Sequence, residues 1–158
     1  MAVFGKIEKF LKKEGIDFKI IDFGQEVLRV EDVIKFGINP KETVKTLIIK
    51  AEKKVGFEFK TVFIALAIRG QDRLNFKKVK RLFGTKAELA KPEEVLKVVK
   101  VPVGAVCPVL VGIPLYFDRK ALKLKRVNLG SGDLTKGLNI DMKDLLKAVG
   151  DYEIVDLT

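Results

Sequence analysis

The stretch from Lys100 to Gly112, KVPVGAVCPVLVG, combines residue types that can build an apolar active-site wall. Pro102 and Pro108 fix their own φ angles and remove two backbone donors, while Gly104 permits a positive φ or the close approach of another group. A turn of this kind can align free N–H groups, and apolar neighbours strengthen their hold on a partial negative charge. The alternative is a rigid buried connection between two elements.

The same stretch contains the only cysteine, Cys107, and the chain has no histidine. A reactive thiol needs an activating neighbour, and a cysteine among valines is usually an inert small hydrophobe. A thiol enzyme built on Cys107 is therefore the least favoured interpretation. The missing histidine also excludes a histidine-based triad or zinc site, and we expect neither a metal nor a cofactor.

Lys45 is a second candidate for chemistry. The β-branched run TVKTLIIK from Thr43 to Lys50 predicts a strand. Alternation along that strand puts Lys45 on the same face as Leu47 and Ile49. The lysine either directs a cation into a cleft or extends its stem along an apolar surface to reach water. Both interpretations stay open on the sequence alone.

Basic residues gather on two further segments of a chain whose formal charge is +10 and whose pI is about 9.6. Such a balance favours an anionic partner such as RNA, although a charge run on a helix is also typical of a solvated surface. The first group lies on a helix predicted over 75–83 and comprises Lys77, Lys78, Lys80 and Arg81. The second comprises Lys123, Lys125 and Arg126.

The elements that must position these residues follow from periodicity and from glycine and proline. Asn75 is expected to cap the helix 75–83, Asp141 the last helix, and Gly56 to mark a hairpin. Gly130 to Asp133 predicts a hairpin turn that is too short, and differently spaced, to be a dinucleotide-binding or P-loop fingerprint. Helices are predicted over 3–14, 30–36, 75–83, 92–99 and after 141, with strands over 17–23, 43–50, 61–68, 86–90, 114–117, 126–129, 135–140 and 152–157.

Interleaved helices and hairpins indicate an α+β domain covering residues 1–158, with one large, mixed, mostly antiparallel sheet that curves like a partial barrel. The chain is long enough for one core, and no apolar run approaches the ~20 residues that span a bilayer. We therefore expect a cytoplasmic protein without a membrane partner. Abundant lysine and glutamate, with one cysteine, also fit a thermophilic source.

Three stretches together resemble the YbaK-like aminoacyl-tRNA deacylases, which include the editing domain of bacterial prolyl-tRNA synthetases. They are VKTLIIK at 44–50, LAIRGQDRLNFKKVKRLFG with AELAKPEEV at 66–95, and GAVCP, VNLGSGDL and DMKDLL within 104–146. The ordered set covers nearly the whole chain. The resemblance implies hydrolysis of a wrongly charged amino acid, such as cysteine or alanine, from a tRNA that is usually the one for proline.

The resemblance also implies the site. It assigns the main roles to Lys45 and Gly104, and it implies that the substrate is bound by the residue after the lysine, by the rest of the GAVCP loop and by the GSGD turn. Some relatives use a histidine shortly after that turn, which this chain lacks. The implied substrate-binding residues are Thr46, Ala105, Val106, Cys107, Pro108, Gly130, Ser131, Gly132 and Asp133.

The chemistry is compatible with a chain without histidine, because an aminoacyl ester is already activated and its own ribose hydroxyl or a water can be positioned by the substrate. Lys45 would grip the terminal phosphate or polarise the ester region, and N–H groups near Gly104 would hold the oxyanion. The partners would be tRNA and prolyl-tRNA synthetase. The alternative is a binding module of the same fold that holds tRNA or an aminoacyl ligand without hydrolysing it.

Overall fold

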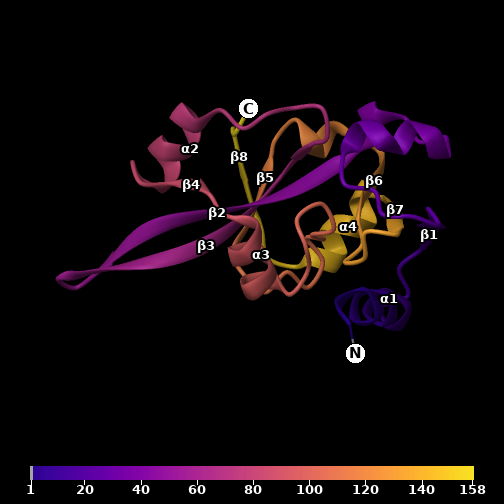
Figure 1. The fold of residues 1–158 in the computed structure, drawn as a ribbon, viewed down its shortest axis with the longest axis horizontal. Helices are drawn as coiled ribbons and strands as arrows, with labels where there is room; N and C mark the ends of the chain where they lie inside the picture. The colour runs from indigo at the N-terminus through magenta and orange to yellow at the C-terminus, as the bar shows by residue number, and fades with distance from the viewer. Residues whose placement is uncertain (1) are drawn as a thin grey trace.

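The computed structural model describes residues 2–158, in which strands alternate with short helices (Figure 1). The predicted α+β class is confirmed. The strands are β1 (Phe18–Asp22), β2 (Val44–Val55), β3 (Glu58–Arg69), β4 (Glu88–Leu89), β5 (Leu115–Asp118), β6 (Arg126–Gly130), β7 (Lys136–Asp141) and β8 (Glu153–Val155). The helices are α1 (Val3–Lys13), α2 (Phe76–Phe83), α3 (Pro92–Val99) and α4 (Met142–Val149), with 3₁₀ helices η1 (Val30–Phe36), η2 (Pro40–Glu42) and η3 (Ala121–Lys123).

The strands are divided between two sheets, a five-stranded one in the order β4-β2-β3-β5-β8 and a three-stranded one in the order β1-β7-β6. Pairing is antiparallel except at β3–β5 and β5–β8. A parallel bridge between Thr43 and Asn128 connects the two sheets. The mixed, mostly antiparallel pairing agrees with the sequence, whereas the single curved sheet that we expected is two sheets that do not close into a barrel.

The central strand β3 separates two apolar clusters. Ala65 and Ala67 belong to the larger cluster, which α1, α3 and α4 cover, and Leu66 and Ile68 belong to the smaller cluster beneath α2. All four side chains are 0% exposed. Burial on both faces explains the nearly uninterrupted apolar sequence of this strand, as predicted.

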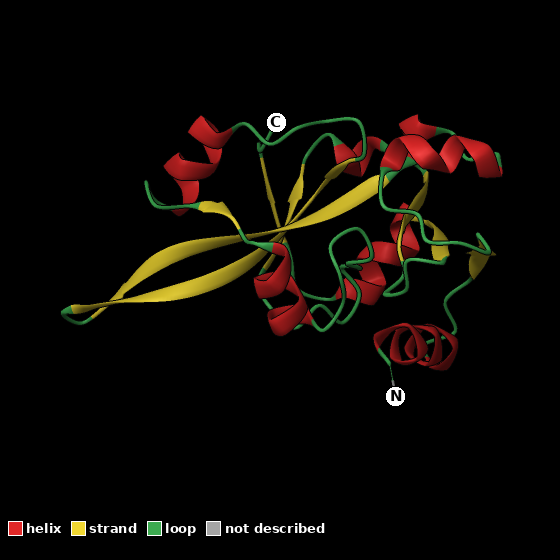
Figure 2. Cartoon of the chain, viewed as in Figure 1, coloured by secondary structure: helices red, strands yellow, loops and turns green. Residues whose placement is uncertain are grey.

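The β2–β3 hairpin is longer than the sequence predicts. The two strands pair from Val44–Arg69 to Val55–Glu58, and Gly56 turns the chain with φ 65° (Figure 2). Our prediction ended β2 at Lys50, where the β-branched apolar run ends, and residues 52–60, of which five are charged, lie beyond it. Polar residues are compatible with a strand whose faces both meet water, so composition alone concealed this extension.

Helix starts and lengths depend on local capping. The predicted cap at Asn75 is confirmed, since its Oδ1 accepts a hydrogen bond from the Lys77 N–H at 3.1 Å. Asp141 precedes α4 but makes no side-chain cap, because its carboxylate accepts from Arg126 Nη1 at 3.1 Å. The segment η1 is a 3₁₀ helix with no buried residue, so no apolar stripe favours a regular α-helix there.

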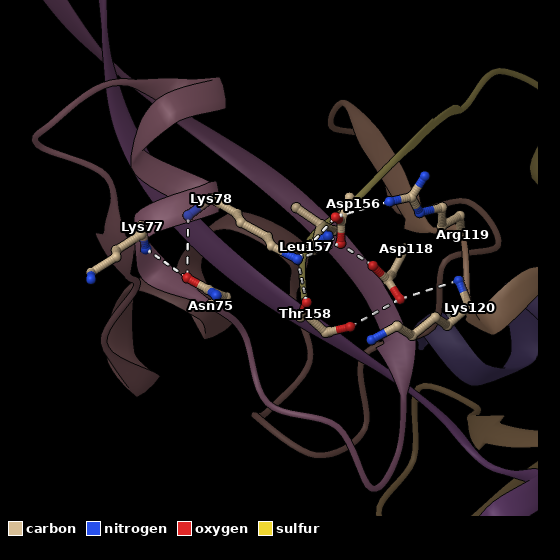
Figure 3. A network of polar contacts seen from close by, with 9 residues as sticks. All are labelled: Asn75, Lys77, Lys78, Asp118, Arg119, Lys120, Asp156, Leu157 and Thr158. Carbon is tan, nitrogen blue, oxygen red and sulfur yellow. Dashed lines mark hydrogen bonds and ion pairs between the residues drawn. The ribbon is translucent and has the colours of Figure 1, made fainter.

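The C-terminal residues are held by Asp118, which is 0% exposed at the end of β5. Its carboxylate accepts from the Leu157 N–H at 2.8 Å and from Thr158 Oγ1 at 3.3 Å (Figure 3). Lys78 on α2 adds an ion pair to Asp156 at 2.9 Å. This network fixes the last described residues between α2 and the end of β5.

Replacing Asp118 with alanine would leave the buried Leu157 N–H without an acceptor. We expect Asp118→Ala to lower the free energy of unfolding by about 2–3 kcal/mol, as for a lost hydrogen bond to a charged group. Chemical denaturation measures this change, with Asp118→Asn, which keeps one acceptor oxygen, as the milder control. An alanine variant within about 0.5 kcal/mol of the wild type would contradict the role of Asp118.

Candidate functional site

A cavity of about 420 Å³ lies where the start of β2 meets the GAVCP loop and the β6–β7 turn. The segment that leads into η1 closes another side of it. Most of its wall is apolar, and two of its apolar residues, Leu28 and Val103, are 62% and 45% exposed. Further apolar wall residues are Phe23, Val27, Val33, Ile38, Leu129 and Leu134.

Lys45 lines this cavity from β2 and is partly buried. Burial lowers the pKa of the Lys45 ammonium, whereas the carboxylates of Glu31 and Asp72 act in the opposite direction and Arg73 lowers the pKa further. The cation is therefore less well hydrated than one in water, and it lies near acidic groups that favour its charged form. Such a lysine is suited to binding an anionic group at the cavity wall.

Thr46 also lines the cavity, and its side chain is 8% exposed. Within residues 2–158, its Oγ1 is buried without a hydrogen-bond partner. An unpaired buried hydroxyl usually costs about 1–3 kcal/mol, so such a group in a native fold needs an explanation. A polar group of a ligand in this cavity would supply the missing partner.

The GAVCP loop reaches the cavity through Gly104, whose φ is 96°. The positive φ favours glycine, and a Cβ there would also make a tight contact of 3.2 Å with the carbonyl oxygen of Leu28. The Ala105 N–H donates to Pro102 O at 3.0 Å. Across the part of the chain that the structure describes, the Gly104 N–H has no acceptor and is available to a ligand.

Gly130 and Gly132 of the GSGD turn let this turn dock on the GAVCP loop. The Gly132 N–H donates to Ala105 O at 2.8 Å, and a Cβ on Gly130 would lie only 2.4 Å from Val106 O. Asp133 folds the turn by accepting from Thr135 Oγ1 at 2.7 Å and from the Thr135 N–H at 2.8 Å, and these hydrogen bonds lower the pKa of its carboxyl. The structure thus brings two of the predicted motifs together.

Several predicted substrate-binding residues lie behind the wall rather than in it. The cavity is lined by Thr46, Val106, Gly130 and Asp133 among them. Ser131 uses its hydroxyl to donate to Lys136 O at 2.6 Å, and a Cβ on Gly132 would meet the α1 backbone at 2.9 Å. Five predicted residues do not line the cavity: Ala105 and Cys107 belong to the larger apolar cluster, Pro108 and Ser131 are buried, and Gly132 packs against α1.

Cys107 is 4% exposed, and its burial raises the pKa of the thiol to about 12. The thiol is therefore protonated at neutral pH and cannot act as a thiolate nucleophile.

The predicted basic surfaces do not reach the cavity. Lys78 forms an ion pair with Asp156. Arg126 donates a hydrogen bond to Asn139 and forms an ion pair with Asp141. The basic residues of these two surfaces that have no ion-pair partner among residues 2–158 are Lys77, Lys80, Arg81, Lys123 and Lys125.

Asn128 is a cavity residue that the sequence analysis missed. Arg126 Nε donates to Asn139 Oδ1 at 2.6 Å, and Asn139 Nδ2 donates to Asn128 Oδ1 at 2.8 Å. A guanidinium can only donate, so it fixes the orientation of both amides and leaves the Asn128 NH₂ group as a donor. Within residues 2–158 this group has no acceptor. The signal in the sequence that could have identified this site was the presence of two asparagines, Asn128 and Asn139, within apolar strands.

Glu31 and Asp72 are acidic residues near Lys45, and the sequence analysis missed these two residues as well. Glu31 comes from η1 and Asp72 from the turn after β3, where it pairs with Arg69 at 2.7 Å. Among residues 2–158, no group of acidic, cysteine or histidine side chains is placed to hold a metal ion. Nor does any helix of that part have the length and apolarity to cross a membrane.

The sequence profile of the aminoacyl-tRNA editing domain family matches residues 26–148, and the chain belongs to this family. The resemblance inferred from the KTL, GAVCP and GSGD motifs is thereby confirmed.

Relatives of known function include synthetases. The proline–tRNA ligase of Caldicellulosiruptor bescii is 31% identical over 121 residues, which cover 75% of this chain and 20% of the ligase. The ligase of Legionella pneumophila is 31% identical over 110 residues, covering 68% of this chain and 18% of the ligase. The chain thus spans about a fifth of the length of these curated relatives.

Solved structures match over the whole fold. A hypothetical protein has a TM-score of 0.79 and 30% identity, covering 96% of this chain and 98% of its own. A protein described as a proposed trans-editing enzyme for prolyl-tRNA synthetase has a TM-score of 0.78 and 23% identity, covering 100% and 98%. The similarity to this second structure, at 23% identity, shows that the two chains share a fold.

The buried position of Cys107 leads to a prediction about its role. Cys107→Ala should lower the free energy of unfolding by about 1–2 kcal/mol or less, because the side chains are similar in volume. Activity on a mischarged tRNA should be largely retained, since the protonated thiol takes no part in attack. Single-turnover deacylation and denaturation measure the two effects. Abolished turnover together with a trapped thioester in the wild type would contradict this assignment.

Proposed function

We propose that this chain is a trans-editing deacylase that hydrolyses the ester of a mischarged tRNA, with tRNA for proline carrying cysteine, alanine or a similar small amino acid as its substrate. One observation carries the proposal. Lys45, the unpaired Thr46 hydroxyl and the free N–H of Gly104 line one cavity in a chain that belongs to the editing family. A cation and unpaired donors in one apolar cavity are suited to an anionic, ester-bearing ligand.

In the proposed reaction, a water attacks the ester carbonyl carbon. The carbonyl oxygen becomes an oxyanion, which the Gly104 N–H stabilises in a site of low dielectric. The bond to the ribose oxygen then breaks, and that oxygen takes the proton that the attacking water gives up through the neighbouring ribose hydroxyl, so that the free amino acid and the tRNA leave. The neighbouring ribose hydroxyl orients the water, so the substrate supplies a function that a histidine would otherwise provide. Lys45 holds the terminal phosphate.

The cavity and the relatives support the substrate class. A cavity of about 420 Å³ would be shared between the end of the tRNA and the amino acid, which favours a small side chain. The proline–tRNA ligases among the relatives support tRNA for proline, with a prolyl-tRNA synthetase as the enzyme that makes the error. Action in trans is supported by the structural likeness to a proposed trans-editing enzyme.

Asn128 extends this assignment. Its NH₂ group, oriented by the chain of amides from Arg126, is a donor that lines the cavity. We assign it to an acceptor of the substrate, such as a ribose or phosphate oxygen, because a carbonyl or phosphate oxygen is what an amide donor binds.

The first prediction from this function concerns Lys45 and Gly104. Lys45→Ala should reduce kcat/KM for deacylation about 100-fold or more, and Gly104→Val should do the same by blocking the oxyanion position. Release of the labelled amino acid from tRNA for proline charged with cysteine, alanine, serine or threonine measures both. Lys41→Ala, which removes an exposed lysine outside the cavity, is the matched control.

Two outcomes would contradict the catalytic assignment. Normal turnover by a well-folded Lys45→Ala protein would remove the lysine from the mechanism. If the wild-type chain binds aminoacyl-tRNA but hydrolyses none of the four esters faster than buffer does, the binding module is the correct function. Lys45 and Gly104 would then serve recognition only.

The second prediction concerns the polarity of the Asn128 amide. Asn128→Asp replaces a donor with a charged acceptor of equal size, so we expect kcat/KM to fall roughly 10- to 100-fold, as for a lost hydrogen bond with an unpaired partner. Asn139→Ala should give a smaller loss, because it removes the orienting group and leaves the donor in place. An Asn128→Asp variant that matches the wild type would show that Asn128 does not contact the substrate.

A further inference from the structure

The β2–β3 hairpin continues past the sheet as a two-stranded arm, defined here as residues 52–61. β4 pairs with β2 only at Ile49 and Lys50, and β5 pairs with β3 only from Ala65 to Ala67. The arm therefore has two free edges and projects from the body of the molecule (Figure 1; Figure 2). Every residue of the arm is exposed.

The arm exposes large apolar side chains at its tip. Phe57, Phe59 and Val55 are 102%, 65% and 47% exposed. The register puts Val55 and Phe59 on opposite faces of the arm, with Phe57 in the turn between them. The exposed apolar side chains are thus distributed over both faces and the turn of the arm, whereas a protein-binding site is typically one continuous apolar patch.

Lysines accompany these side chains on both faces. Lys54 stands directly opposite Phe59, and Lys53 stands directly opposite Lys60. Like charges across a ladder repel each other and destabilise the pair. Within residues 2–158, none of the three lysines forms an ion pair. An external anion between Lys53 and Lys60 would remove the repulsion.

We propose that the arm binds RNA, with Lys53, Lys54 and Lys60 on phosphates and Phe57 or Phe59 stacked on an unpaired base. An aromatic ring beside a lysine matches a nucleotide, which presents a flat base next to a phosphate. Lysines on an exposed edge also discourage the addition of another strand, which disfavours pairing with a second copy.

The proposal extends the function proposed above, and it identifies the RNA as the tRNA substrate. Lys45 and Val55 are ten residues apart on β2, which at ~3.3 Å per residue separates the cavity from the arm tip by roughly 33 Å. A tRNA whose charged end occupies the cavity would therefore meet the arm with a different part of its length. The arm would contribute to affinity for tRNA and leave the chemistry at the cavity unchanged.

The test compares two arm variants with one control variant. The first carries Lys53→Gln, Lys54→Gln and Lys60→Gln, and the second carries Phe57→Ser and Phe59→Ser. The control carries Lys9→Gln, Lys13→Gln and Lys147→Gln on the exposed faces of α1 and α4, away from the arm tip (Figure 1). All the changed residues are exposed, and thermal melting verifies that each variant is folded.

The probe is an uncharged transcript of tRNA for proline, and binding is followed by fluorescence anisotropy over a range of salt. We expect each arm variant to bind roughly ten-fold more weakly, in line with the loss of one stacked base or several phosphate contacts. The plot of log affinity against log salt should become shallower by about 2 in the lysine variant alone. We expect the control variant to change the affinity for tRNA by less than about two-fold, because the proposal places no phosphate on the three lysines that it replaces.

A second substrate separates this inference from the proposed function. Hydrolysis of a small aminoacyl ester of adenosine, which is too short to reach the arm, should be unchanged in both arm variants. If no ester is hydrolysed but the arm variants still lose tRNA affinity, the arm proposal stands and the deacylase function fails. Unchanged affinity and salt slope in both arm variants would overturn the arm proposal, as would a wild-type dimer in light scattering that the Phe57→Ser, Phe59→Ser variant converts to a monomer.

Discussion

The close backbone contact between the GSGD turn and the GAVCP loop is the constraint on which the cavity depends. At Gly130 no side chain fits, because Val106 O already occupies the space. The Gly132 N–H then ties the turn to Ala105 O. This contact holds Gly104 at the wall while Ala105 and Cys107 pack into the core behind it. The front of the loop is therefore left for a ligand, because its other side is used in packing.

The cavity combines two kinds of unsatisfied groups on a mostly apolar wall. Lys45 is poorly hydrated, and Thr46, Gly104 and Asn128 offer polar groups without partners in the described chain. In water such groups would be solvated, but here their orientations are set by strands and by a charged hydrogen-bond chain. A site of this kind is organised before a ligand arrives, so binding does not have to reorient its dipoles.

Local patterns in the sequence predicted much of the fold but only part of the site. The buried strand β3, the Asn75 cap and the role of Gly104 in a positive φ turn follow from neighbouring residues, and each agrees with the structure. The β2–β3 extension was missed because its charged residues face water on both sides. Asn128 could not be assigned, because its role depends on a partner on another strand that hairpin register brings opposite it. Glu31 reaches Lys45 only through tertiary packing of an irregular segment.

The division of the strands into two sheets means that the cavity wall is built from both of them. Lys45 and Thr46 belong to one sheet and Asn128 and Gly130 to the other, and a bridge from Thr43 to Asn128 connects the two. Side chains of both sheets, such as Val44 and Leu129, also pack in one apolar cluster. A ligand in the cavity would therefore contact both sheets at once, so its binding would add to the contacts that hold them together.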